Sequence, residues 1–136
     1  MTTNEKIVKM EDMKAKLSTL WIVVMFNMVF ADILSFMLPD FLEILQTGQA
    51  GGVPITQEIL LVFAVFLEIP IVMIILSRVL KVSVNRWANI IAAVITILFV
   101  VGGGSTSLHY IFFATIEVAC MLLIIWYAWL WPNPET

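Results

Sequence analysis

Basic residues are absent from most of this 136-residue chain. Its seven lysines and arginines occupy two short stretches, which are Lys6, Lys9, Lys14 and Lys16 near the amino end and Arg78, Lys81 and Arg86 in the middle. The formal net charge is -3. Because nucleic-acid binding rests on a basic surface that neutralises phosphates, the sequence predicts no nucleic-acid partner.

Cysteine and histidine are nearly absent as well. A single cysteine, Cys120, allows no internal disulfide and no paired redox motif. The single histidine, His109, lies in the same apolar segment, and one residue of each type does not make a metal or haem site. The sequence also lacks GxSxG, HExxH, a phosphate-binding loop and a dinucleotide-binding glycine pattern. We therefore expect no metal and no cofactor, and enzymatic activity is the less favoured interpretation.

Apolar residues take up the rest of the chain. They make up 62% of it, against about 45–50% in a soluble domain, and the mean hydropathy is +1.05. Four apolar segments, at about 17–38, 57–80, 86–101 and 109–130, approach the length that a helix needs to cross about 30 Å of hydrocarbon. The first is too long for the apolar core of a signal peptide, so we interpret it as a retained span.

The distribution of basic residues predicts the orientation of these spans. Lysine and arginine concentrate on the cytoplasmic side of membrane proteins. Segment 1–16 and the loop between the second and third spans should both be cytoplasmic, and so should the tail 132–136. We expect an all-α integral protein of a bacterial inner (plasma) membrane, with an antiparallel four-helix transmembrane domain over 17–131 and both termini in the cytoplasm.

The segments between the spans are short. Residues 1–16 could form a short helix on the inner surface. In the longest connection, 41–56, FLEILQ is typical of an amphipathic turn or two, and TGQAGGVP is typical of irregular chain. The three glycines at 102–104 should end the third span, because glycine destabilises helices.

Three carboxylates fall inside the predicted spans, namely Asp32, Glu68 and Glu117. Ionisable groups in hydrocarbon are costly, so such residues are candidates for function. No basic residue lies at their depth to act as a counter-charge. We therefore expect them to be protonated in part and to line one polar pocket that binds protons or a ligand. The competing interpretation is that they only form hydrogen bonds between helices.

Two other polar side chains and a proline accompany these acids. Asn27 lies near the middle of the first span, and His109 lies at the outer mouth of the fourth. His109, Phe113 and Glu117 recur every four residues and should form one stripe facing the bundle interior. Asn27 and His109 are further candidates for ligand or proton binding. Pro70 follows Glu68 by two residues and should bend the second span.

Several features resemble the DoxX/DoxD-like group of small four-span bacterial membrane proteins. They are the glutamate in LEIP (residues 67–70), the basic inner loop SRVLKVSVNR and the aromatic end of the last span. More narrowly, the opening LSTLWIVVMFNMVFADILSF is similar to that of a four-span bacterial family of unknown function. The broad resemblance implies the fold, and implies roles in redox chemistry or as accessory respiratory subunits. The small multidrug exporters are a rival resemblance, but their essential glutamate lies in the first span, which here carries Asn27 and Asp32.

Three functions follow as hypotheses. The first is proton-linked transport or binding of a small ligand at a carboxylate-lined site. The second is an accessory or structural subunit of a larger membrane complex, with a membrane-protein partner. The third, less favoured, is an enzyme acting on a lipid or quinone with a carboxylate as acid or base. The lipid bilayer is a partner in all three.

Overall fold

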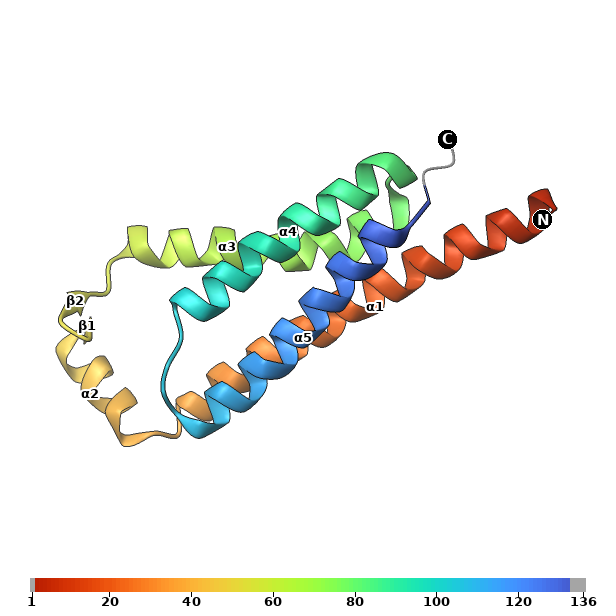
Figure 1. Ribbon diagram of the computed structural model, residues 1–136. Coiled ribbons are helices and arrows are strands. Elements are labelled where there is room, and N and C mark those ends of the chain that lie inside the picture. Colours follow the sequence, from red (N-terminus) through yellow and green to blue (C-terminus); the bar gives the residue numbers. More distant parts are fainter. Residues whose placement is uncertain (1, 133–136) are drawn as a thin grey trace.

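The computed structural model describes residues 2–132, which form helices joined by short connections and one small hairpin (Figure 1). The elements in chain order are α1 (Thr3–Ser35), α2 (Pro39–Thr47), β1 (Gln49–Ala50), β2 (Val53–Pro54), α3 (Gln57–Val79), α4 (Val82–Gly102) and α5 (Leu108–Leu130). Within the described range, α1, α3, α4 and α5 are long and apolar enough to cross a membrane. This confirms the four predicted apolar helices. Of the predicted tail 132–136, residues 133–136 lie outside the described residues.

The four long helices form an antiparallel bundle. α1 packs against α5 and α3, and α4 packs against the same two helices. The start of α1, the α3–α4 connection and the end of α5 lie at one end, and α2 and the hairpin lie at the other (Figure 1). All seven basic residues belong to the first of these ends, which we call the basic end. The α1/α5 and α3/α4 pairs spread apart toward α2, at what we call the opposite end (Figure 1).

The N-terminal segment is not a separate surface helix, contrary to expectation. α1 runs without a break for 33 residues from Thr3. A capping box starts it, in which the Glu5 amide donates to the Thr2 hydroxyl (3.3 Å) and the Thr2 amide donates to the Glu5 carboxylate (2.8 Å). The lysine-rich first part of α1 extends beyond the bundle, and residues 2–9 are exposed (Figure 1).

Two other segments have more regular structure than expected. The third long helix already begins at Val82, ahead of the predicted start of the third span, and the Asn85 amide donates to the Lys81 carbonyl (2.8 Å). The segment TGQAGGVP is not irregular, since Ala50 pairs with Val53 and Gln49 with Pro54 in an antiparallel hairpin. Its turn needs positive φ at both central positions, which Gly51 (57°) and Gly52 (82°) supply.

A buried polar network joins three helices in the half of the bundle nearer the basic end. Asn89 of α4 is its centre: its side-chain oxygen accepts from Trp21 Nε1 of α1 (2.8 Å) and from Ser77 Oγ of α3 (3.1 Å). Its Nδ2 donates to the Asn85 carbonyl (2.9 Å), and Asn85 Nδ2 donates to the Ser77 carbonyl (2.8 Å). Ser77, Asn85, Asn89 and Trp21 have no exposed surface. The network therefore provides hydrogen-bond partners for buried polar groups, which lipid could not provide.

Arg86 holds the end of α5 to the start of α4. Its Nε donates to the Ala128 carbonyl (2.9 Å) and its Nη2 to the Trp129 carbonyl (3.1 Å). These are carbonyls of the last helical turn, which have no partner within their own helix. A cation at this position also matches the negative end of the helix dipole.

Replacing Arg86 with alanine should therefore lower the free energy of unfolding in lipid by about 1–2 kcal/mol. Amide exchange should speed up in the last turn of α5 and not at its start. Lys81→Ala is the matched control, because Lys81 is an exposed cation of the same connection. If the two substitutions lower the free energy of unfolding equally, then the positive charge of Arg86 matters and its two hydrogen bonds to α5 do not.

Candidate carboxylate site

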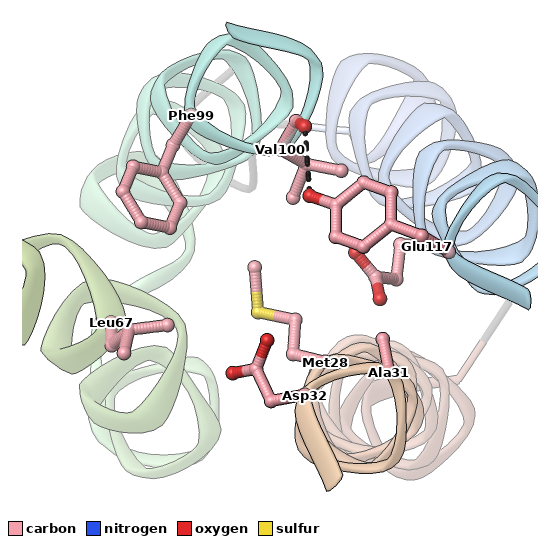
Figure 2. A pocket seen from close by; sticks show the side chains of 8 residues that line it. Met28, Ala31, Asp32, Leu67, Phe99, Val100 and Glu117 are labelled. Atoms are coloured by element: carbon pink, nitrogen blue, oxygen red, sulfur yellow. Dashed lines mark hydrogen bonds between the residues drawn. The ribbon is translucent and has the colours of Figure 1, made fainter. Parts of the chain in front are cut away.

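A small cavity lies between the four long helices, toward the opposite end. Its volume is about 50 Å³, and every long helix contributes to its lining: Met28, Ala31 and Asp32 from α1, Leu67 from α3, Phe99 and Val100 from α4, and Tyr110 and Glu117 from α5 (Figure 2). A buried water needs about 10–15 Å³ of such volume. The cavity therefore has room for a few water molecules.

Glu117 is the most buried acid at this cavity. Its side chain is 3% exposed and belongs to the inward face of α5, together with Met121, Ile124 and Ala128. The spacing of these four residues by four, three and four positions gives them one helical face. In residues 2–132 no hydrogen bond joins the Glu117 carboxyl to another protein group, and no lysine or arginine lies at its depth. A buried acid without a protein partner needs water, a proton or a cation.

Asp32 approaches the same space from α1. It follows the buried Ala31 and lies one turn after Met28, so the packing of α1 directs it to the cavity. Figure 2 shows the carboxyl groups of Asp32 and Glu117 extending from α1 and α5 into the space between the helices. Unlike Glu117, Asp32 keeps an exposed surface. Asp32 therefore stands where the cavity meets its surroundings, and Glu117 lies inside.

Two hydrogen bonds join the ends of the helices that form this site. The Tyr110 hydroxyl donates to the Val100 carbonyl (3.2 Å) and ties the start of α5 to the end of α4. His109 Nε2 lies 2.9 Å from Ser35 Oγ, which joins the start of α5 to the end of α1. Ser35 Oγ also donates to the Ala31 carbonyl (2.8 Å). Because a hydroxyl has one proton, this arrangement makes Nε2 of His109 the donor to Ser35.

The structure brings together only part of the predicted site. Asp32 and Glu117 line the cavity, whereas His109 does not line it and contacts Ser35 at the end of α1 instead. Glu68 does not join them: its side chain is exposed on the outward side of α3, and the neighbouring Leu67 lines the cavity instead. At about 100° per residue, Glu68 lies on the side of α3 opposite the buried face of Pro70, Met73 and Ser77, whereas Leu67 is half-buried. The expectation that all three acids line one pocket is therefore wrong for Glu68.

Asn27 and Pro70 also lie away from the cavity. Asn27 Nδ2 donates to the Val23 carbonyl of its own helix (2.8 Å), so it links no second helix in the described chain. Pro70 is buried within α3, which continues on both sides of it. Because proline has no amide hydrogen, it cannot donate to the carbonyl of Phe66.

Sequence reasoning missed Tyr110, a polar residue that lines the cavity. Tyr110 lies seven residues before Glu117, which is two helical turns, so extending the stripe of His109 and Glu117 to its neighbours would have found it. Thr96 of α4 is 2% exposed, and its hydroxyl has no hydrogen-bond partner in residues 2–132.

A second hollow adjoins the cavity. It has a volume of about 370 Å³, lies between the end of α4 and the start of α5, and shares Val100 and Tyr110 with the carboxylate cavity. Its other lining residues are Val101, Gly104, Ser105, Ile111, Ala114, Thr115 and Val118. Tyr110 therefore stands between the polar cavity and a larger, mainly apolar groove.

The site offers two acids, which is fewer ligands than a metal centre built from protein side chains alone requires. In the part of the chain that the structure describes, no three His, Cys, Asp or Glu residues lie close enough to bind one ion. The arrangement is a pair of carboxyl groups beside a phenol, in a space that admits water. Such a pair can bind and release protons, or bind a small cation by charge.

Comparison with known sequences gives the chain a family. A family model matches residues 5–136, nearly the whole length. The chain belongs to DUF6326, a family of unknown function. No curated protein and no solved structure matches it. Membership of DUF6326 confirms the narrower resemblance, to a family of unknown function, while the relation to the DoxX/DoxD-like group stays a prediction.

Proposed function

We propose that this DUF6326 protein is an integral protein of the bacterial inner membrane, with the basic end of the bundle in the cytoplasm. The grouping of all seven basic residues at one end supports this orientation. Both termini would then be cytoplasmic, and α2, the hairpin and the carboxylate cavity would lie toward the outer side.

Cysteine labelling tests this orientation. In a Cys120→Ser background, a membrane-impermeant maleimide applied to spheroplasts should modify Gln49→Cys, in the exposed hairpin, and spare Lys81→Cys. Both should react after the membrane is permeabilised. If only Lys81→Cys is labelled in intact spheroplasts, the basic end faces outward and the proposed orientation is wrong.

We further propose that the Asp32–Glu117 pair binds a small monovalent cation in exchange for protons. The buried Glu117 carboxyl, which faces a cavity without a protein partner, is the observation that carries this proposal. Cavity size favours a small cation, because pockets for drug-sized ligands measure about 300–1,000 Å³ and this one admits only a few waters. Since a proton and a cation neutralise the same carboxylates, the binding of one displaces the other.

Liposomes with a trapped pH-sensitive dye test the exchange. An imposed Na⁺ or K⁺ gradient should drive proton movement in liposomes that contain the wild type. Glu117→Gln should reduce this movement at least about tenfold, since losing even one charge-assisted contact costs that much. Glu43→Gln is the control, because Glu43 lies on α2 outside the cavity.

Two results would contradict the proposal. The first is wild-type protein that moves no more protons than empty liposomes. The second is a Glu117→Gln variant that behaves like Glu43→Gln. Either result would favour the alternative of an accessory subunit, in which the acids serve only helix packing.

A further inference from the structure

A carboxylate faces outward in the middle of an apolar helix. Glu68 is the twelfth of the 23 residues of α3, and its side chain is exposed. The face that α3 buries against the bundle consists of Pro70, Met73 and Ser77. A carboxyl group on the outside of a membrane-spanning helix would meet hydrocarbon, which is a costly environment for it. This face of α3 therefore requires a polar partner.

The chain does not supply that partner within one molecule. All lysines and arginines belong to the basic end, and Arg78, the nearest along α3, lies ten residues away. No hydrogen bond reaches the Glu68 carboxyl from any other residue in 2–132. The partner must come from outside the molecule.

The residues around Glu68 show what kind of helix would fit against it. An outward stripe of α3 combines one acid with five apolar residues at alternating spacings of four and three, namely Leu61, Val65, Glu68, Val72, Ile75 and Val79. The apolar members are exposed, Leu61 by 66% and Ile75 by 63%. Alternating spacings of four and three are the pattern of a left-handed helix pair, in which one polar residue at the seam fixes the register.

We infer that a second copy of this chain covers the stripe, with the two α3 helices packed in parallel about a two-fold axis normal to the membrane. Two-fold symmetry places each residue of the stripe at the same depth as its equivalent, so Glu68 meets Glu68 of the second copy. A protonated carboxylic acid both donates and accepts a hydrogen bond, so two such acids satisfy each other by exchanging a pair of hydrogen bonds. No other side chain on this face of α3 is needed.

This dimer leaves the carboxylate cavity intact. Leu67 lines the cavity from the inner side of α3, and Glu68 points away from it. Self-association and cation binding therefore use different faces of α3. A test that rules out one of them leaves the other standing.

Disulfide cross-linking in liposomes tests the interface while Glu68 stays in place. In a Cys120→Ser background, Ile75→Cys should form disulfide-linked dimers on mild oxidation, because Ile75 lies two turns from Glu68 on the same stripe. Ala119→Cys is the matched control: Ala119 is exposed and is the twelfth residue of α5, as Glu68 is of α3. We expect Ile75→Cys to cross-link at least about tenfold faster than Ala119→Cys, as a seam position should.

Substitutions of Glu68 separate a specific pair from random collision. Glu68→Leu should weaken dimerisation about tenfold, as expected for one lost hydrogen bond between helices in lipid. Glu68→Gln should retain it, because an amide also donates and accepts. Energy transfer between donor- and acceptor-labelled copies, measured as lipid is added, gives the dimer fraction of each variant.

Three results would overturn the inference. One is wild-type protein that stays monomeric at every lipid dilution. Another is Glu68→Leu that dimerises as tightly as the wild type. The third is a photo-cross-linker at position 75 that captures a different membrane protein in native membranes and no second copy.

Discussion

Replacing Asn89 with leucine is expected to lower the free energy of unfolding in lipid by about 2–3 kcal/mol, the largest effect on stability of any substitution proposed for this chain. Leucine has a similar volume, so packing is largely kept. The substitution removes the acceptor of both Trp21 Nε1 (2.8 Å) and Ser77 Oγ (3.1 Å). Both donors are fully buried, so neither finds water in its place. The cost arises mainly from these unsatisfied donors.

Asn27→Leu is the control for this substitution. Asn27 is also a mid-span asparagine, but its side chain bonds only to the Val23 carbonyl of its own helix. Asn27→Leu should lower the free energy of unfolding by less than about 1 kcal/mol, because no group on another helix loses a hydrogen-bond partner. Reversible unfolding in mixed micelles gives both values. Equal losses would mean that the Asn89 network does not hold the helices together.

Replacing Ala31 with leucine is expected to slow cation-driven proton exchange strongly while leaving both acids in place. Ala31 is 2% exposed and lines the cavity. Three additional carbon atoms would take up the space that water or a cation needs beside Glu117. We expect the rate in liposomes to fall roughly tenfold or more, which corresponds to about 1.4 kcal/mol of lost binding or access.

Overpacking by itself also destabilises a protein, by about 1–3 kcal/mol. Ala92→Leu controls for this effect, because Ala92 is a similarly buried alanine of α4 that does not line the cavity. Ala92→Leu should retain exchange in the fraction of protein that remains folded. If folded Ala92→Leu loses exchange, or if Ala31→Leu exchanges protons at the full rate, then the cavity is not the site of exchange.

The sequence predicted the long helices well, because lipid imposes their length and hydropathy. It predicted the ends of the helices less well. The charged residues of 3–16 continue α1, since glutamate and lysine are strong helix formers and hydropathy alone does not detect them. The hairpin at Gln49–Pro54 depends on two glycines with positive φ, and the Gly-Gly pair was a signal that could have been used.

The candidate site was only partly predictable for a related reason. Glu117 and Asp32 were found because acids avoid lipid, and both line the cavity. The same reasoning placed Glu68 inside, where it is not. α3 is apolar on every side, so its sequence does not determine which face turns inward. That choice follows from the packing of Pro70, Met73 and Ser77 against the other helices.

Asp32 and Glu117 are expected to share one hydrated cavity. Infrared spectroscopy of the protein in lipid, recorded over a range of pH in H₂O and D₂O, shows whether water and protons reach their carboxyl groups. We expect a carboxylic C=O band that titrates, shifts on deuteration, disappears in Glu117→Gln and titrates at a different pH in Asp32→Asn. A Glu117 band that responds to neither pH nor D₂O would show instead that this acid is sealed among packed helices, with no hydrated cavity beside it.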